Sequence, residues 1–199
     1  AAEAFKENLE ILMTEEKYLP EQVFNVIETV LFWKKMPEKT YVSKETMSML
    51  GFKADKDRLT LLIGGNAMGY KLKPFLVYHT ENPKAFKGIC KGSLPVHFRA
   101  NKKGCVTQAL FDDWFLNCFS SEVNAYCLRN GIPFKILLIL DGAPNRAQYL
   151  NDLNPNIKVI FFPPHTTSIL QPMEQGAIAV LKMCYIRNTF AKAVDVIEN

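Results

Sequence analysis

The 199-residue chain lacks a long apolar run, and no stretch approaches the roughly 18 to 20 residues that a membrane-spanning helix needs. Residues 1–17 have the pattern of an amphipathic helix and lack the basic-then-apolar order of a secretory signal. We therefore expect a protein that is neither membrane-bound nor secreted by its own signal. Internal repeats and low-complexity linkers are also missing, which predicts a single domain over residues 1–199 that opens with a helix at 1–17.

The chain has few cysteines, and their spacing matches no common disulfide or metal-binding motif. The five cysteines are odd in number, and none of them forms a C-x-x-C pair. We interpret them as reduced thiols of an intracellular protein. A zinc site that adds His79 or His97 is the alternative, but the spacings match no known finger pattern.

The basic charge is unevenly distributed. Apolar residues make up 48% of the chain and charged residues 22%, which is typical of a folded globular protein. Residues 34–103 carry fifteen Lys and Arg against five Asp and Glu, whereas residues 1–33 carry two against seven. A basic stretch can bind a phosphate backbone because each neutralised phosphate releases counterions. A solvated, lysine-rich surface is the alternative. The candidate DNA-binding residues are Lys34, Lys35, Lys39, Lys53, Lys56, Arg58, Lys102 and Lys103.

Three strands are expected in the first half of the chain. Residues 23–33, 58–63 and 74–79 are rich in β-branched and aromatic side chains and predict an antiparallel meander. The second and third strands are joined across the glycine-rich segment 64–69. No Lys-Ser/Thr pair follows Gly69, as a phosphate-binding loop would require, so a hairpin turn is favoured.

The second half alternates between helices and strands. Residues 107–130 show a helical period, with Thr107 as N-cap and Gly131 just past the end. A buried strand at 136–140, a short helix around 146–150, a strand at 159–162 and a helix from about 172 to 194 follow. Residues 84–103 show few regular signals and are expected to form an irregular loop. This order predicts an α/β protein with a ribonuclease H-like fold, a mixed five-stranded sheet flanked by helices.

Asp141 directly follows the buried strand at 136–140. Carboxylates at the carboxyl ends of parallel strands point into the crevice where open α/β sheets bind ligands. Asp141 is therefore a candidate catalytic or metal-binding acid. An aspartate that stabilises a turn or caps a helix is the alternative.

Three segments resemble motifs of the Tigger/pogo transposases, which are DDE endonucleases. Residues 24–37 are similar to the family's first motif, Asn-x-Asp-Glu-Thr-Gly followed by Leu-Phe-aromatic, and residues 137–144 to its second, Leu-Leu-x-Leu-Asp-Asn-Ala-Pro. The most specific likeness is at 163–176, which resembles Pro-Pro-Asn-Thr-Thr-Ser-x-Leu-Gln-Pro-Met-Asp-Gln-Gly. The resemblance covers roughly residues 18–190 and agrees with the predicted fold.

The resemblance implies a site of three acids that hold two divalent ions, Mg²⁺ or Mn²⁺, for attack on a phosphodiester. The second acid falls on Asp141, and the third on Glu174, where the family usually has Asp. The first falls on Ile27, which offers no oxygen ligand. Glu28 is adjacent, but neighbouring strand residues point to opposite faces. Gly142 and His165 also stand where the family has Asn.

We therefore expect a transposase-derived, catalytically inactive domain that acts in the nucleus and binds DNA weakly and without sequence preference. Two alternatives remain open. One is a weak metal-dependent endonuclease that uses Asp141 and Glu174, and the other is a protein-interaction module. Family members usually carry DNA-reading helix-turn-helix and centromere-protein-B-like domains upstream, and nothing similar to these is expected within residues 1–199.

Overall fold

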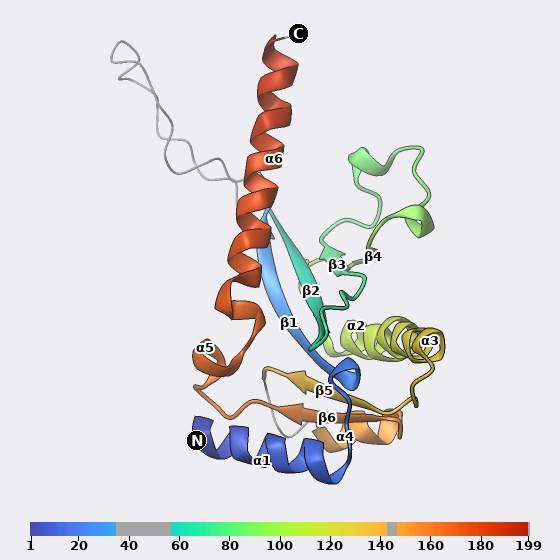
Figure 1. Cartoon of the computed structure of the whole chain (residues 1–199). Coiled ribbons are helices and arrows are strands. Elements are labelled where there is room, and N and C mark those ends of the chain that lie inside the picture. Colours follow the sequence, from blue (N-terminus) through green and yellow to red (C-terminus); the bar gives the residue numbers. More distant parts are fainter. Residues whose placement is uncertain (35–56, 143–146, 199) are drawn as a thin grey trace, which may run out of the picture.

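A computed structural model describes residues 1–34, 57–142 and 147–198. Its centre is a mixed six-stranded sheet in the order β4-β3-β2-β1-β5-β6, with helices on both faces (Figure 1). The predicted α/β, ribonuclease H-like arrangement is confirmed, with one strand more than expected. The strands are β1 (Val23–Phe32), β2 (Arg58–Asn66), β3 (Phe75–Tyr78), β4 (His97–Ala100), β5 (Ile136–Leu140) and β6 (Ile157–Phe161).

Strands β1, β2 and β3 form the predicted antiparallel meander. The turn after β2 is held by Asn66, whose side-chain oxygen accepts hydrogen bonds from the backbone N–H groups of Met68 and Tyr70. A Cβ at Gly65 would collide with the carbonyl oxygen of Tyr70, so the chain needs glycine there for a close backbone approach. The glycine-rich segment is thus a hairpin turn, as predicted.

The sixth strand arises inside the segment expected to be an irregular loop. Residues 97–100 pair in parallel with β3 and form the edge strand β4, which follows the short helical turns η3 (Lys84–Phe86) and η4 (Lys91–Ser93). Only Phe98 of its four residues is buried. Such a short edge strand carries too little apolar alternation to be seen in the sequence, which is why the strand count was wrong.

One face of the sheet is covered by the helix predicted at residues 107–130. It consists of α2 (Gln108–Asp113), a π-helical segment η5 (Trp114–Phe119) and α3 (Ser120–Asn130). The Thr107 hydroxyl accepts a 3.4 Å hydrogen bond from the N–H of Leu110, and Gly131 ends the helix in the left-handed conformation. Phe115 and Phe119 pack against Phe24 of β1 in the larger apolar core. Helix α4 (Ala147–Leu153) lies on the same side, since Leu150 belongs to that core.

The opposite face carries the two ends of the chain. Helix α1 (Ala2–Glu15) packs Phe5 and Leu9 against Leu137 and Ile139 of β5. The segments α5 (Thr167–Leu170), η7 (Met173–Ala177) and α6 (Ile178–Glu198) follow β6, and α6 runs beside β1 in Figure 1. On this face the side chains belong to alternate strand residues, which include Asn25 and Ile27 of β1.

Helices of the length and hydropathy needed to cross a membrane are not found in the described part of the chain.

All five cysteines are free thiols. Cys118 and Cys127 are buried and Cys90 and Cys184 are exposed, so they are distributed between the core and the surface.

Candidate functional site

Asp141 lies at the position predicted for it, immediately after the fully buried strand β5. Its side chain is exposed, and its Oδ1 accepts a 2.8 Å hydrogen bond from the hydroxyl of Thr167 at the start of α5. Because β5 lies between the parallel strands β1 and β6, the carboxylate emerges at the carboxyl edge where parallel strands present ligand-binding groups. Thr167 was not predicted as part of the site, although it stands in the Thr-Thr-Ser motif.

Ile27 lies beside Asp141. Strands β1 and β5 pair in parallel up to Val26 and Leu140, and the residues that follow this last pair in the chain are Ile27 and Asp141. Residues that pair across parallel strands direct their side chains to the same face. The side chain of Ile27 is 6% exposed, so an apolar group occupies the place next to the carboxylate.

Glu28 is directed to the other face of the sheet. It pairs with Leu62, which belongs to the core beneath α2 and α3. The Glu28 side chain is exposed, yet partial desolvation raises the pKa of its carboxyl, and a hydrogen bond from the backbone of Val106 offsets this only in part. Val106 belongs to the loop before α2, so Glu28 is turned away from Asp141.

Glu174 lies in η7, which contacts β1 and follows α5 closely in the chain. Its side chain is exposed, and its backbone N–H donates to the carbonyl of Gln171 at 3.1 Å. The backbone leaves helical geometry at Gln175 and at Gly176, where φ is 130°. The third-acid segment is therefore a kinked turn before α6, and the regular part of the long helix predicted from 172 begins at Ile178.

The side chains near Asp141 do not fit a two-metal site. Hard divalent ions take oxygen ligands, and the place beside Asp141 holds the hydrocarbon of Ile27. One oxygen of Asp141 already accepts from Thr167. Across residues 1–34, 57–142 and 147–198, no group of three or more His, Cys, Asp or Glu side chains is placed to hold a metal ion.

Two amide side chains lie buried on the same face. Asn25 is 8% exposed and donates to the carbonyl of Ile139 at 3.1 Å. Gln171 is completely buried, and neither of its amide atoms has a hydrogen-bond partner among the described residues. Both residues stand in the motifs quoted above, but residue type alone did not reveal that they would be buried.

The two Asn replacements have different backbone settings. His165 has a left-handed φ of 62°, a conformation in which Asn, Asp and His are all enriched among non-glycine residues. Gly142 has a φ of 121°, which favours glycine. His165 therefore keeps the local backbone that Asn would also accept, whereas Gly142 permits a conformation that Asn would strain to adopt.

The predicted DNA-binding residues divide into three groups. Lys35, Lys39, Lys53 and Lys56 lie outside the described residues. Lys34 forms a 2.7 Å ion pair with Asp57 and lies over the ring of Trp33.

The third group comes together on the α2 side of the sheet. Arg58 begins β2, and two residues later the hydroxyl of Thr60 donates a 2.6 Å hydrogen bond to the carbonyl of Gly104. This bond holds the turn that carries the exposed side chains of Lys102 and Lys103 next to β2. We call the exposed residues Arg58, Lys102 and Lys103, which lie on the two segments that this bond joins, the basic edge.

Known proteins resemble this chain in sequence and in fold. The sequence profile of the DDE superfamily endonuclease matches residues 56–199. The human Tigger transposable element-derived protein 7 is 35% identical over 92% of this chain and 34% of its own length. The human Jerky protein homolog is 37% identical over 88% of this chain and 31% of its own. The ARS-binding protein 1 of Schizosaccharomyces pombe is 30% identical over 82% of this chain and 31% of its own length.

Among solved structures, a pre-cleavage Mos1 transpososome matches with a TM-score of 0.58 at 12% identity, over 96% of this chain and 52% of that one. A Mos1 mariner paired-end complex with Mn matches with a TM-score of 0.55 at 14% identity, over 96% of this chain and 52% of that one. These likenesses concern the fold. The chain spans about a third of the length of its curated relatives. Because the family profile covers most of the chain and agrees with the motifs and the sheet, this protein belongs to the DDE superfamily of endonucleases.

Proposed function

We propose that this domain is a catalytically inactive DDE endonuclease that binds DNA without sequence preference. The observation that carries the inactivity is the position of Ile27, which is buried and stands, like Asp141, one residue past the last registered pair of β1 and β5. A DDE site needs a carboxylate there to share a pair of divalent ions with the other acids. An isoleucine supplies none, and Glu28 is directed to the opposite face.

The experiment that tests the inactivity is a thermal melt with and without millimolar Mn²⁺, paired with a supercoiled-plasmid nicking assay. The unmodified protein is expected to show no shift and no nicking. Ile27→Asp is expected to lower the melting temperature without metal and to gain a Mn²⁺-dependent rise, because a ligand bound at about a hundred times its dissociation constant adds about 2.7 kcal/mol. Mn²⁺-dependent nicking by the unmodified protein that Asp141→Ala abolishes would overturn the proposal in favour of a weak nuclease.

Ile63→Asp is the matched control. Ile63 pairs with Ile27 across β1 and β2, so its side chain lies on the same face but one strand further from Asp141. Neighbouring strands are about 4.8 Å apart, and β2 is two strands away from β5. A carboxylate at position 63 would therefore be too far away to share an ion with Asp141. A Mn²⁺ shift in both variants would therefore be nonspecific, and a shift in Ile27→Asp alone locates the ion at the first-acid position.

The DNA-binding half rests on the basic edge of Arg58, Lys102 and Lys103 and on the excess of basic residues between 34 and 103. Side chains of this kind bind phosphates and not bases. We expect duplex dissociation constants of roughly 10⁻⁴ to 10⁻⁶ M at physiological salt, weakening linearly in the logarithm of the salt concentration. ARS-binding protein 1 and the CENP-B homolog protein 2 are relatives whose names point to chromosomal sites, which supports action in the nucleus.

The DNA-binding test is fluorescence anisotropy with two labelled duplexes of unrelated sequence at several salt concentrations. The double variant Lys102→Ala with Lys103→Ala should weaken binding to both duplexes equally and lower the salt slope by about one for each phosphate that the protein no longer neutralises. Lys6→Ala is the control, since it removes one charge from the acidic amino-terminal helix. Absence of duplex binding at low salt would contradict this half and favour a protein-interaction module.

A further inference from the structure

A large cavity lies on the α6 side of the sheet, away from Asp141. Its volume is about 690 Å³, within the range of about 300 to 1,000 Å³ typical of small-molecule sites. It is formed by residues just past the end of β1, by the start of β2, by β3 and β4, by the turn η3 with the residues before it, and by α6. Trp33 in its wall follows Ile27 by six residues, which is roughly 20 Å along a strand. The cavity is therefore separate from the first-acid position.

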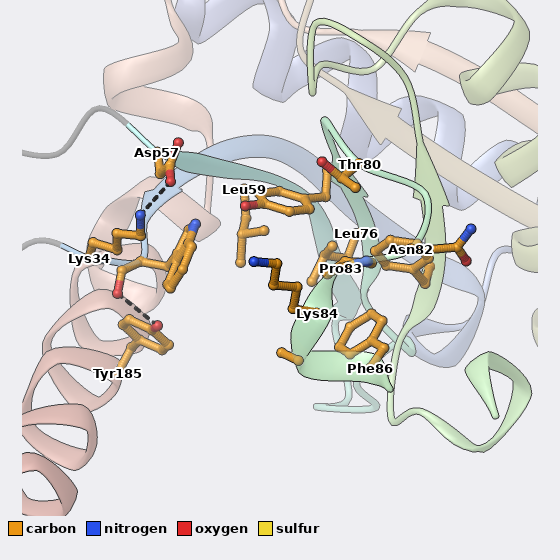
Figure 2. A pocket seen from close by; sticks show the side chains of 14 residues that line it. Lys34, Asp57, Leu59, Leu76, Thr80, Asn82, Pro83, Lys84, Phe86 and Tyr185 are labelled. Carbon is orange, nitrogen blue, oxygen red and sulfur yellow. Dashed lines mark hydrogen bonds and ion pairs between the residues drawn. The ribbon is translucent and has the colours of Figure 1, made fainter. Parts of the chain in front are cut away.

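The walls of this cavity are aromatic. Figure 2 shows Tyr185 of α6 on one side and Phe86 of η3 on the other, with Leu59 and Leu76 of the sheet between them. Five of the lining residues are aromatic: Trp33, Tyr78, Phe86, Phe98 and Tyr185.

The positions of these rings are fixed by specific contacts. The Tyr185 hydroxyl donates a 3.0 Å hydrogen bond to the carbonyl of Trp33, and Phe86 packs edge-on against Phe98 with ring centroids 5.2 Å apart. The cavity is thus held open between two supported aromatic walls.

Positive charge and a hydrogen-bond donor accompany the aromatic walls. In Figure 2 the side chain of Lys84 extends across the space between the Tyr185 side and the Phe86 side. Lys34 lines the cavity beside its ion pair with Asp57. The indole N–H of Trp33, a residue of the wall, is buried and has no hydrogen-bond partner among the described residues. The cavity therefore combines flat apolar surface with groups that favour an anion.

We propose that this cavity receives an unstacked nucleotide of single-stranded DNA, with the base between the aromatic walls and the phosphate beside Lys84. Aromatic platforms bordered by basic side chains are the means by which proteins bind single strands, since every base has a flat face that can stack. A purely apolar peptide would make no use of the Lys84 charge. This inference rests on the proposed function, because it assumes that the domain meets DNA, and it adds a second, strand-selective contact to the basic edge.

The test compares three labelled probes by anisotropy: a short oligothymidylate, an abasic oligomer of the same length, and a duplex. The unmodified protein should bind oligothymidylate more tightly than the abasic oligomer. Phe86→Leu should weaken oligothymidylate binding roughly tenfold, the loss expected of one stacked base. It should leave the duplex and the abasic oligomer bound as before.

Lys84→Gln removes the charge and keeps only the first two methylenes of the side chain, and because Lys84 is exposed the change should not disturb the core. It should weaken oligothymidylate binding severalfold, whereas Lys87→Gln, an exposed neighbour outside the cavity, should not. The Lys84 and Lys87 pair keeps the test decisive if Phe86→Leu disturbs folding.

Salt-dependent duplex binding together with equal binding of oligothymidylate and the abasic oligomer would overturn this inference and leave the proposed function intact. Unchanged oligothymidylate binding in both Phe86→Leu and Lys84→Gln would likewise overturn it, and would leave an apolar protein segment as the better occupant. If the unmodified protein did not bind the duplex at all, that result would instead contradict the proposed function.

Discussion

The hydroxyl of Thr167 donates a 2.8 Å hydrogen bond to Oδ1 of Asp141, and this bond ties the start of α5 to the end of β5. A hydrogen bond to a charged acceptor is stronger than one between neutral groups, although the exposure of Asp141 reduces its value. Asp141 thus has a structural role in this domain, independent of any ion.

A double-mutant cycle measures that role. Thr167→Val should lower the free energy of unfolding by about 1 kcal/mol, and it should have almost no effect once Asp141 has been replaced by Ala. Thr167→Ser keeps the hydroxyl and should be close to neutral. Urea unfolding of the four proteins gives the coupling, and additive effects of Thr167→Val and Asp141→Ala would show that the bond contributes nothing to stability.

Ile27 should stabilise the domain in the absence of metal. Burying an isoleucine side chain is worth about 1.5 to 3 kcal/mol, and Ile27→Asp removes this and places a second carboxylate beside Asp141. We expect Ile27→Asp to lose about 2 kcal/mol or more at neutral pH. Repulsion and burial would raise the pKa of the new carboxyl. The loss in free energy of unfolding of Ile27→Asp, relative to the unmodified protein, should therefore shrink as the pH falls.

Ile27→Val separates packing from charge. It removes one methylene and should cost about 0.5 to 1.5 kcal/mol at every pH. Urea unfolding at neutral and acid pH checks both variants. An Ile27→Asp protein as stable as the unmodified one at neutral pH would show that the side chain at this position is solvated and not packed.

Strong local signals account for what could be predicted from the sequence. The uninterrupted apolar run of β5, the capped helix between Thr107 and Gly131 and the glycine turn at Gly65 each depend on contacts close in the chain. The acid positions followed from motifs. The parallel register of β1 with β5 ends at Val26 and Leu140, one residue before Ile27 and Asp141.

The features that were missed depend on contacts distant in the chain. Strand β4 exists because β3 offers it a partner, and its own four residues carry little pattern. The cavity joins Trp33 to Tyr185, which are far apart in sequence and meet only when α6 packs beside β1. Gln171 has the sequence pattern of an ordinary polar residue, yet the turn between α5 and η7 buries it completely. Burial and cavities are properties of the assembled layers and not of a single segment.

His165 reports on backbone conformation. Its φ of 62° costs a side chain with a Cβ roughly 1 kcal/mol, less for Asn or His than for a β-branched residue. We expect His165→Asn to be neutral or slightly stabilising, and His165→Val to lose about 1 to 2 kcal/mol. Melting temperatures of the two variants decide the matter. If His165→Val matches His165→Asn, the left-handed conformation does not constrain this exposed position.

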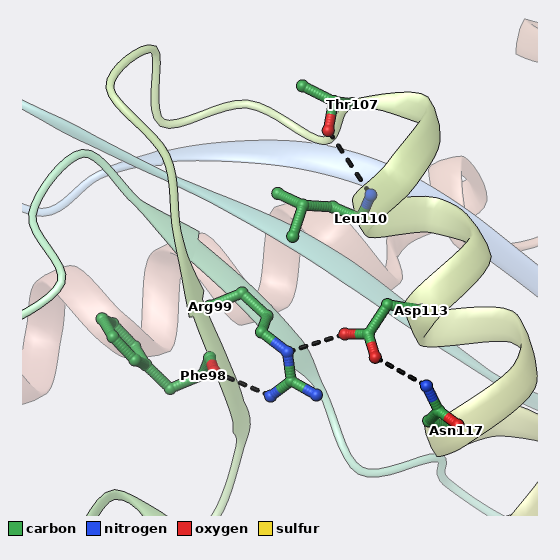
Figure 3. Close-up of polar contacts among 6 residues, drawn as sticks. All are labelled: Phe98, Arg99, Thr107, Leu110, Asp113 and Asn117. Carbon is green, nitrogen blue, oxygen red and sulfur yellow. Dashed lines mark hydrogen bonds and ion pairs between the residues drawn. The ribbon is translucent and has the colours of Figure 1, made fainter.

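Arg99 and Asp113 join the added strand β4 to helix α2. Arg99 Nε donates to Asp113 Oδ2 at 2.7 Å, and Asn117 donates to the other carboxylate oxygen at 2.8 Å (Figure 3). A second guanidinium nitrogen donates to the carbonyl of Phe98 at 2.9 Å. Burial alone would raise the pKa of Asp113, but the hydrogen bonds from Arg99 and Asn117 outweigh it, so the pKa is lowered. The edge strand is therefore anchored by a carboxylate that must stay ionised.

The last prediction follows from the sign of that shift. A carboxyl whose pKa is lower in the folded state stabilises the fold above its unfolded pKa of about 3.9, and this contribution is lost as the pH falls through the folded value. Arg99→Met keeps an unbranched apolar side chain but removes the guanidinium that lies over the ring of Phe75 and pairs with Asp113. It should lower the free energy of unfolding by up to about 1 kcal/mol at neutral pH, since the pair is only partly buried.

The deficit of Arg99→Met should shrink in acid, where Asp113 is protonated in both proteins, to the part that comes from the lost contacts with Phe98 and Phe75. Urea unfolding at pH values on either side of the transition measures it, with Lys103→Met as a control that removes an exposed charge from the neighbouring turn. A deficit that persists unchanged in acid would mean that Arg99 acts through packing on Phe75 and its bond to Phe98, and that the ion pair with Asp113 does not hold β4 in place.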